Sequence, residues 1–412
     1  MRFIPFAMLL TTAAITAHAA ATPIASSSLM KRDDATGFEW DPESFKVAAV
    51  RKPPVGFVYH ALSNQSTWYN YNLNATIAKS VEMIHQAASE GTKFITFPEL
   101  YFPGYPAFRT PNGPKDFKQY VSQTMEPDGP EWNTLMQAFA ETKMYGVVGW
   151  AQRANDSLFM TQSLVGPLAD GSGSAGTIWK HEKFRPSGTE RSLYSDGLLD
   201  TIRAQKLPFG TVSMLQCWEH VYPESHFISA SQPANLHVAS FPKNNLTPSS
   251  TSKFGNDVPE SDGAGTPYKF WRSAAIGYQA GASAFPFMLL PTAGAATIFA
   301  RGGSPLNEST SNSKESTDST PYITAVINTT ESFRDTSYSV NDWYSYGALK
   351  HIIEGLPDGM PRRSGPFFGR ILFTIREFTK GYIWPPTLGC MASEKWPCIK
   401  IWPERVEGDF MA

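Results

Sequence analysis

Short apolar segments with strand-like patterning alternate with segments of helical periodicity along most of this chain, from about Phe45 onward. The stretch 77–88 places apolar residues at helical spacing, and it lies between two strand-like runs at 46–50 and 93–97. Such alternation over about 300 residues, without internal repetition, favours a single α/β domain. Further strand-like runs lie at 145–150, 159–166, 177–184, 211–217, 236–241, 284–290, 296–300 and 322–327, and further helical segments at 131–143 and 268–279.

The N-terminal residues have the composition of a targeting signal. Residues 1–20 combine Arg2, an apolar stretch and a small-x-small cleavage pattern, which is typical of a secretory signal peptide. Residues 21–44 form a Ser/Ala/Pro-rich leader with the dibasic pair Lys31 and Arg32, which is either a processing site or a solvated charge pair. We therefore predict a secreted protein.

The rest of the chain divides into one domain and a tail. The alternating pattern occupies residues 45–350, which we interpret as the folded domain. Residues 351–412 contain a Pro/Gly/Arg-rich linker and several Pro and Trp residues, so we expect a C-terminal extension that packs on the domain or on a second subunit. No apolar run of about 18 residues follows the signal, and we expect no membrane association once the signal is removed.

Charge and composition exclude several classes of protein. The chain has 412 residues with 35 basic and 37 acidic side chains, so its net charge of -2 gives no electrostatic reason to expect nucleic acid as a partner. Its aromatic content of 13% indicates a large core and an aromatic-walled pocket, with core packing alone as the alternative interpretation.

If the protein is secreted, its N-x-Ser/Thr sequences are candidate glycosylation sites, because secreted chains can carry glycans at such positions when they face solvent. We expect some of them to be glycosylated. The polar segment 304–320 has no periodicity and few apolar residues, which indicates a surface loop or a disordered insertion. The candidate glycosylation positions are Asn64, Asn74, Asn155, Asn245, Asn307 and Asn328.

The chain has 3 cysteines, too few for a disulfide scaffold. Cys390 and Cys398 lie close together in the tail and could pair as a local disulfide. Cys217 is then left over, as an intermolecular bridge, a buried inert thiol or a nucleophile.

The surroundings of Cys217 favour a nucleophile. It ends an apolar strand-like run and precedes the polar sequence Trp218-Glu219-His220, and reacting groups often occupy such strand ends. A thiol needs a base, but residues three apart after a strand rarely face each other, which argues against His220. A metal site at these residues lacks a second ligand pair, so we expect no metal.

Other charged residues follow predicted strands in the same way. Glu99 opens the aromatic, Pro-rich turn LYFPGYP, and apolar walls would raise the proton affinity of its carboxylate, as a general base requires. Lys183, Glu190 and Arg191 lie in the polar run HEKFRPSGTER. Each also has an ordinary structural explanation, as a turn cap, a surface charge or an exposed ion pair.

The sequences FPELYFPGYP, HEKFRPSGTER and LQCWEH occur in that order, and together they resemble the nitrilase branch of the carbon-nitrogen hydrolase superfamily. The resemblance implies a four-layer αββα sandwich. It also implies that Glu99 is the general base, Lys183 the cation, Glu190 a second glutamate and Cys217 the nucleophile. By position, Tyr105 and Trp218 are candidate walls of the substrate pocket.

The resemblance implies hydrolysis of a nitrile to a carboxylic acid and ammonia through a cysteine thioimidate and thioester, with no cofactor. Loss of the thiolate instead of ammonia would give an amide, so a nitrile or cyanide hydratase uses the same residues. The chain could also be a secreted amide hydrolase similar to the pantetheinase and biotinidase group, or a non-catalytic binding protein on the same fold. We expect a small-molecule nitrile or amide as the partner and a homodimer as the assembly, with a higher oligomer as the alternative.

Overall fold

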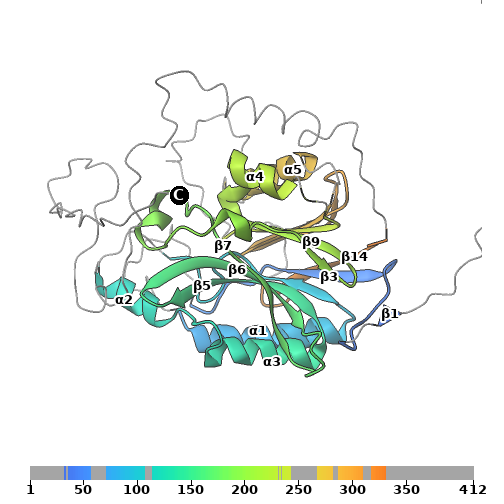
Figure 1. Cartoon of the computed structure of the whole chain (residues 1–412), viewed down its shortest axis with the longest axis horizontal. Coiled ribbons are helices and arrows are strands. Elements are labelled where there is room, and N and C mark those ends of the chain that lie inside the picture. Colours follow the sequence, from blue (N-terminus) through green and yellow to red (C-terminus); the bar gives the residue numbers. More distant parts are fainter. Residues whose placement is uncertain are drawn as a thin grey trace, which may run out of the picture.

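Two six-stranded sheets lie face to face between two pairs of helices in the computed structural model of the chain (Figure 1). Helices α1 and α3 cover the outer face of one sheet, and α4 and α5 lie on the opposite side of the molecule, over the other sheet (Figure 1). This arrangement is the αββα sandwich that the sequence predicts. The structure describes residues 32–33, 36–56, 71–106, 114–230, 232, 234–242, 267–281, 286–309 and 317–330.

The first sheet has the strand order β14-β3-β4-β5-β6-β7. Its centre is parallel, because β3 pairs with β4 and β4 with β5 in parallel, whereas β14, β6 and β7 join antiparallel. Its strands are β3 (Phe45–Val50), β4 (Phe94–Thr96), β5 (Tyr145–Ala154), β6 (Ser157–Pro167), β7 (Ala175–Glu182) and β14 (Tyr322–Ile327).

The second sheet has the order β13-β12-β11-β10-β9-β8 and is also mixed, with β9, β10 and β11 parallel to one another. A separate two-stranded ribbon joins β1 (Arg32–Asp33) to β2 (Glu39–Trp40). The strands of the second sheet are β8 (Gln205–Leu207), β9 (Gly210–Gln216), β10 (Leu236–Ser240), β11 (Phe287–Thr292), β12 (Ala295–Phe299) and β13 (Pro305–Ser309).

The α-helices of the described chain belong to the outer layers, apart from α2 beside the first sheet (Figure 1). Among the described residues, no helix is long and apolar enough to cross a bilayer. The helices are α1 (Leu73–Ser89), α2 (Pro114–Ser122), α3 (Pro130–Thr142), α4 (Pro223–Ala230) and α5 (Pro267–Gly281).

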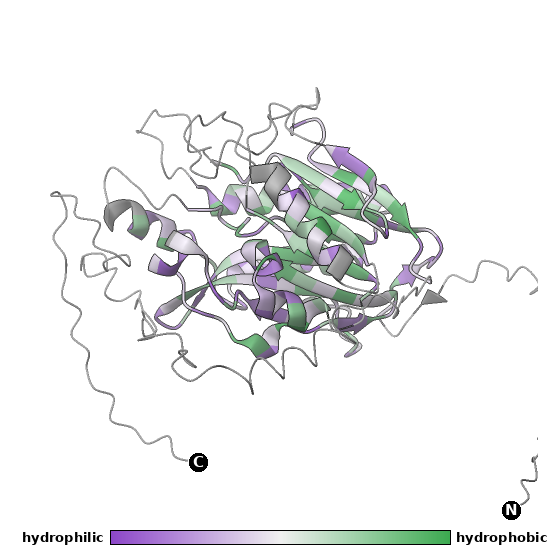
Figure 2. Ribbon diagram, turned by 90° about the horizontal axis from the view of Figure 1, so that it is seen from above, coloured by the Kyte–Doolittle hydropathy of each residue, from purple (hydrophilic) through white to green (hydrophobic). Residues whose placement is uncertain are grey.

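Strand β3 shows why the chain builds four layers. Its side chains alternate between the two faces of the sheet, as strand geometry requires. Phe45 and Val47 join the apolar core between the sheets, whereas Ala48 and Val50 join the core under α1 and α3. Both faces are therefore buried, and Figure 2 shows predominantly hydrophobic strands with hydrophilic residues on the helices.

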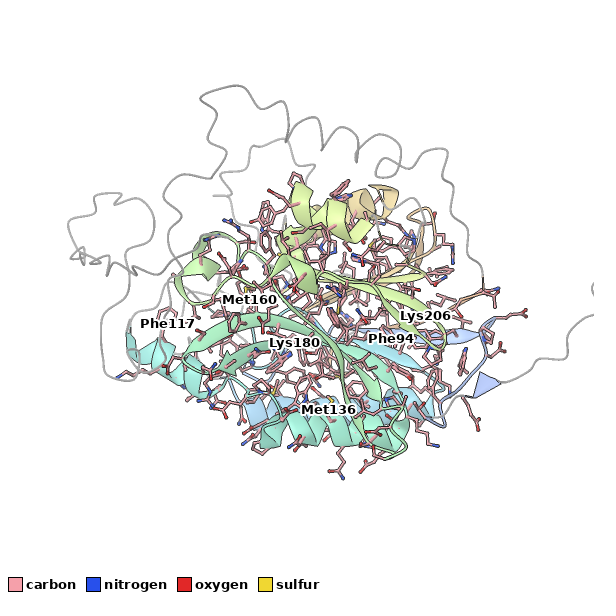
Figure 3. The ribbon with its side chains drawn as sticks, viewed as in Figure 1. Phe94, Phe117, Met136, Met160, Lys180 and Lys206 are labelled. Atoms are coloured by element: carbon pink, nitrogen blue, oxygen red, sulfur yellow. The ribbon has the colours of Figure 1, made fainter. Side chains whose placement is uncertain are left out.

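The two cores can be located from single side chains. Phe94 belongs to the cluster between the sheets, and Met136 of α3 belongs to the cluster between helix and sheet; Figure 3 shows them at these two levels. At about 25 cal/mol per Å² of apolar area removed from water, such extensive burial supplies the main favourable free energy of folding. It also gives the strand ends a rigid support.

The structure confirms the fold class and most of the predicted elements, with several differences. Strands β1, β2 and β8, of two or three residues each, were not predicted. The helices α2 and α4 were not predicted, because their sequences are short and begin with Pro in polar surroundings. The segment 304–320, predicted to be a loop or disordered, is a strand at 305–309. This edge strand exposes four of its five residues, so its polar side chains contact solvent and no apolar alternation marks it.

Other predictions fall outside the described residues. They concern the signal peptide, most of the leader, the extension 351–412, the pair Cys390 and Cys398, and the sequons Asn64 and Asn245.

Parallel strands direct the reacting residues to one end of the sandwich. Glu99 follows β4, Lys183 follows β7 and Cys217 follows β9. Strands β4 and β7 run in the same direction, because two successive antiparallel pairings separate β5 from β7. The two sheets meet at this end, where the Glu99 backbone N–H donates to the Phe241 carbonyl beyond β10 at 3.3 Å.

A glycine in β5 allows the Glu99 turn to approach the sheet. A Cβ added at Gly149 would lie 2.1 Å from the Pro98 carbonyl oxygen and 3.1 Å from the Glu99 Cα. We predict that Gly149→Ala lowers the free energy of unfolding by about 1–3 kcal/mol, the usual cost of overpacking. Urea unfolding monitored by tryptophan fluorescence measures this change.

The matched control is Gly277→Ala in α5, where the added Cβ has no heavy atom within 4 Å. Alanine favours an exposed helical position over glycine by up to about 1 kcal/mol, so this variant should be as stable as the parent or more stable. Equal stability of the two variants would contradict the proposed close approach.

Candidate active site

Lys183 is the centre of a buried cluster of charges. Its Nζ donates to Glu99 Oε1 at 2.7 Å and to Glu190 Oε2 at 2.8 Å. The lysine and both carboxylates are each at most 2% exposed, so water does not screen these ion pairs. Burial opposes the charge on Lys183, but the Glu190 and Glu99 carboxylates outweigh it and raise the lysine pKa well above its usual value.

Glu190 is fixed by its own short helix and by a tyrosine. It belongs to a 3₁₀ helix, Gly188–Ser192, and its Oε2 also accepts the backbone N–H of Ser187. Its Oε1 accepts a hydrogen bond from the hydroxyl of Tyr105 at 2.6 Å. Every oxygen of this carboxylate is therefore engaged, which fits a residue that holds Lys183 and does not itself react.

The Glu99 carboxylate differs, because only one of its oxygens is bonded. Among the described residues, Glu99 Oε2 has no hydrogen-bond partner although it is buried. Desolvation raises the pKa of Glu99 to about 8, against the lowering effect of the Lys183 charge and with a further increase from Glu190. An ionised Glu99 is therefore an unusually strong carboxylate base with a free oxygen.

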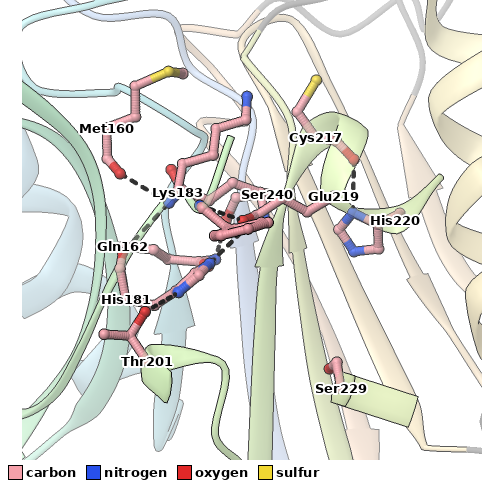
Figure 4. A network of polar contacts seen from close by, with 12 residues as sticks. Met160, Gln162, His181, Lys183, Thr201, Cys217, Glu219, His220, Ser229 and Ser240 are labelled. Atoms are coloured by element: carbon pink, nitrogen blue, oxygen red, sulfur yellow. Dashed lines mark hydrogen bonds and ion pairs between the residues drawn. The ribbon is translucent and has the colours of Figure 1, made fainter. Parts of the chain in front are cut away.

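Cys217 begins a tight turn, the 3₁₀ helix Cys217–His220, directly after β9. Its φ of 49° lies in the left-handed region, which is unfavourable for a residue with a Cβ and is typical of functional sites. Its thiol is free and 2% exposed. Figure 4 shows the sulfur and the Lys183 ammonium pointing to the same side of the polar network.

Electrostatics connect the thiol to the charge cluster. Desolvation raises the Cys217 pKa well above its usual value; the Glu99 carboxylate raises it further, and the Lys183 ammonium and the Trp218 backbone N–H lower it. The thiol is therefore protonated at rest. It forms a thiolate only if a nearby base takes its proton, and the Glu99 carboxylate, which interacts electrostatically with the thiol and has an unbonded oxygen, is the candidate.

His220 lies on the other side of the turn. Its Nδ1 bonds the Cys217 carbonyl at 2.9 Å (Figure 4). Its Nε2 bonds His237 Nε2 at 2.9 Å, so both ring nitrogens are engaged away from the thiol. Burial lowers the pKa of His220 to about 4, which keeps it neutral. Within the described ranges, no group of three His, Cys, Asp or Glu side chains is arranged to hold a metal ion.

The two predicted pocket residues, Tyr105 and Trp218, make different contacts near the site. Tyr105 contacts Glu190 through its hydroxyl, which places it beside the charge cluster. Trp218, directly after Cys217, is half-buried against the rings of Tyr222 and Trp271, with centroids 6.4 and 6.2 Å away. Both positions are consistent with a wall near the thiol.

A second polar group at the site was not assigned a function from the sequence. Glu219 and His181 are completely buried and bonded to each other at 2.8 Å (Figure 4). Glu219 lies within the quoted CWEH motif and His181 within HEKF, so their positions were visible in the sequence. The contact between them could not be seen in the sequence, because His181 belongs to the first sheet and Glu219 follows a strand of the second.

The described sequons differ in exposure. Asn74, Asn155 and Asn307 are exposed, whereas Asn328 is half-buried. The side-chain nitrogen of Asn307 donates to the Thr324 carbonyl at 2.9 Å, so one of its two N–H groups is already engaged.

Comparison with known proteins gives the family. The family model for carbon-nitrogen hydrolases matches residues 46–287. The chain is 31% identical over 220 residues to an aliphatic nitrilase of Rhodococcus rhodochrous, covering 52% of this chain and 55% of that one. It is 31% identical over 195 residues to a cyanide hydratase of Armillaria gallica, covering 45% and 49%. The matches thus span about half the length of these curated relatives.

Among solved structures, a carbon-nitrogen hydrolase from Helicobacter pylori G27 shares the fold. The two chains superpose with a TM-score of 0.51 and 14% sequence identity, covering 77% of this chain and 99% of the other. The family model includes Glu99, Lys183, Glu190 and Cys217 within its matched range. The chain therefore belongs to the carbon-nitrogen hydrolase family.

Proposed function

We propose that this protein hydrolyses carbon–nitrogen bonds by covalent catalysis at Cys217, with an organic nitrile as its substrate. One observation carries the proposal. The buried Lys183 ammonium lies between Glu99 and Glu190, and Glu99 keeps one oxygen free to take the thiol proton.

The first half of the reaction forms a carbon–sulfur bond. Glu99 takes the proton of Cys217, and the thiolate attacks the electrophilic nitrile carbon. Negative charge then develops on the nitrile nitrogen, where the Lys183 ammonium stabilises it and protonation completes a thioimidate. The low dielectric of the site strengthens this stabilisation, because the ammonium is already oriented by two carboxylates.

The second half begins when water adds to the thioimidate carbon. Expulsion of ammonia leaves a thioester, which a second water converts to the carboxylic acid and the free thiol. Expulsion of the thiolate instead releases an amide after one water. The acid is the proposed main product, and the amide is the second candidate because the chain resembles both an aliphatic nitrilase and a cyanide hydratase.

The charges of the site favour an uncharged substrate. When Glu99 is ionised, two carboxylates and one ammonium leave the cluster with an excess negative charge. An anionic substrate would be repelled in this unscreened environment, whereas a neutral nitrile would not. Amides are also neutral, so an amide hydrolase remains the alternative that product analysis decides.

We predict that the purified protein releases acid and ammonia from uncharged nitriles, and that Cys217→Ala and Lys183→Gln reduce turnover at least about 1000-fold by removing the nucleophile and the cation. Separate measurement of acid, amide and ammonia over a panel of nitriles and amides checks this prediction. The matched control is Lys180→Gln, since Lys180 is a more exposed lysine of the same strand paired with Glu182. Activity confined to amides would refute the nitrile assignment, and turnover by Cys217→Ala would refute the nucleophile.

The reactivity of the thiol should depend on the Glu99 pKa. The Glu99 pKa of about 8 implies that alkylation of Cys217 by iodoacetamide accelerates as pH rises toward 8, because only ionised Glu99 accepts the thiol proton. Peptide mass spectrometry follows Cys217 separately from the other cysteines. Glu99→Gln should shift this acceleration to higher pH, and a rate that levels off near pH 4–5 in the parent would contradict the assigned base.

We also propose that the protein is secreted and glycosylated, on the basis of its N-terminal sequence and its sequons. We propose a homodimer as the assembly, since glycans on the surface could block the contacts of a higher oligomer. Asn74 and Asn155 are exposed and not bonded through their side-chain nitrogens to other described residues, which makes them the favoured glycan positions. Expression in a secreting host should yield medium-borne protein whose mass falls on enzymatic deglycosylation. Protein retained in the cells at an unmodified mass would contradict this proposal.

A further inference from the structure

We propose that Glu219 and His181 form a buried ion pair that sets the position of Lys183 relative to Cys217, so that both are positioning residues for the reaction. The kinetic part of this inference rests on the proposed function. The charge state of the pair does not, and it can be tested separately.

The carboxylate of Glu219 bonds the backbone beside each of the two reacting residues. Its Oε1 accepts the N–H of Phe184, the residue after Lys183, at 2.8 Å. Its Oε2 accepts the N–H of Gln216, the residue before Cys217, at 2.9 Å. One rigid, planar carboxylate therefore connects the two segments of main chain, and on each side it bonds the residue directly adjacent to Lys183 or Cys217.

This connection joins the two sheets of the sandwich. Lys183 follows β7 in the first sheet, and Cys217 follows β9 in the second. Strand hydrogen bonds fix each residue within its own sheet but do not fix one sheet relative to the other. The Gln216 side chain adds a weaker bridge, donating to the Met160 carbonyl of β6 at 3.1 Å. Glu219 is thus the charged contact at this junction.

The hydrogen bonds of His181 determine its protonation. The Thr201 hydroxyl donates its single proton to the Leu198 carbonyl at 2.6 Å, so at 2.9 Å it accepts from His181 Nδ1. On the other side, His181 Nε2 lies 2.8 Å from Glu219 Oε2. Desolvation opposes the charge on Glu219, but the contact with His181 and then the two backbone N–H groups lower the Glu219 pKa, so the carboxylate is ionised. Both ring nitrogens then carry protons, and His181 is an imidazolium.

Such a pair is costly to bury. Both side chains are 0% exposed, and the desolvation of two charges commonly cancels the gain from their attraction. An apolar pair of similar volume could fill the space without this penalty. It could not accept the two backbone N–H groups, so the geometry points to orientation of the neighbouring main chain as what the pair provides.

Glu219 does not occupy the place of a reacting group. Its two oxygens are engaged by Phe184, Gln216 and His181, whereas the ammonium of Lys183 bonds Glu99 and Glu190. It therefore acts through the backbone, and its substitution should affect the rate of reaction more than substrate affinity.

The charge state is tested on the unmodified protein labelled with ¹⁵N at its histidines. Long-range ¹H–¹⁵N spectra at neutral pH should show one histidine with protons on both ring nitrogens, because the Thr201 hydroxyl and the Glu219 carboxylate each accept from the His181 ring. His181→Gln should remove this signal. If every histidine is neutral under these conditions, the ion pair is disproved, whatever the enzyme does.

Kinetics test the positioning. In Glu219→Gln an amide NH₂ replaces one carboxylate oxygen, so one backbone N–H loses its acceptor. We expect kcat to fall about tenfold or more, because misplacement of a reacting group by 1 Å can cost about 100-fold in rate. KM should change less than about threefold. His181→Gln should have a similar effect. Because the two residues act as one unit, the double variant should be little worse than either single variant.

The matched control is Glu182→Gln. Glu182 lies between His181 and Lys183 in the sequence, but its carboxylate bonds Gln152 and Lys180. The Glu182→Gln variant should retain kcat. An unchanged kcat in Glu219→Gln, or equal losses in the control, would overturn the positioning role. Absence of carbon–nitrogen hydrolysis in the parent protein would instead refute the proposed function and leave the charge-state result valid.

Discussion

The Lys183 ammonium, buried between two carboxylates, is the interaction on which the rest of the site depends. An isolated ammonium at this depth would lose its proton, because the apolar surroundings disfavour charge. Glu190 holds it with both oxygens engaged, and Glu99 holds it with one oxygen and keeps the other free. The same burial that makes the cluster costly gives Glu99 the basicity to deprotonate Cys217. The buried charges thus lower the stability of the folded protein and increase the basicity of Glu99 at one end of the sandwich.

The fold allows this exchange because the sheets bring together strand ends that are far apart in the sequence. The apolar clusters on both faces of each sheet stabilise the layers, and the buried His181–Glu219 pair and Gln216 connect the layers where the reacting residues lie. Hydrogen bonds on both sides of Cys217 then support its left-handed backbone conformation. Glu219 accepts the N–H of Gln216 before it, and His220 bonds the Cys217 carbonyl. This support explains how a strained residue can keep a fixed orientation.

Much of the fold and the candidate site could be predicted from the sequence, because both depend on local patterns. Alternating periodicities identified the strands and helices of an α/β domain, and Glu99, Lys183 and Cys217 were visible as residues that follow strands. The four-layer sandwich and the roles of these residues were implied by the family resemblance of the motifs that contain them. The contact between Glu219 and His181 could not be predicted, since it depends on the packing of two sheets. Edge strand β13 was missed for a related reason: its pairing with β12 is visible only in three dimensions.

The most direct test of covalent catalysis at Cys217 is to trap the intermediate. The protein is mixed with an uncharged nitrile, quenched in acid within the first turnovers, digested and analysed by mass spectrometry. We predict that the peptide containing Cys217 gains either the mass of the nitrile, as a thioimidate, or the mass of the corresponding acyl group less one hydrogen, as a thioester. Glu99→Gln should form neither adduct. Turnover of the nitrile with no adduct on Cys217 under any quench condition would contradict the central claim.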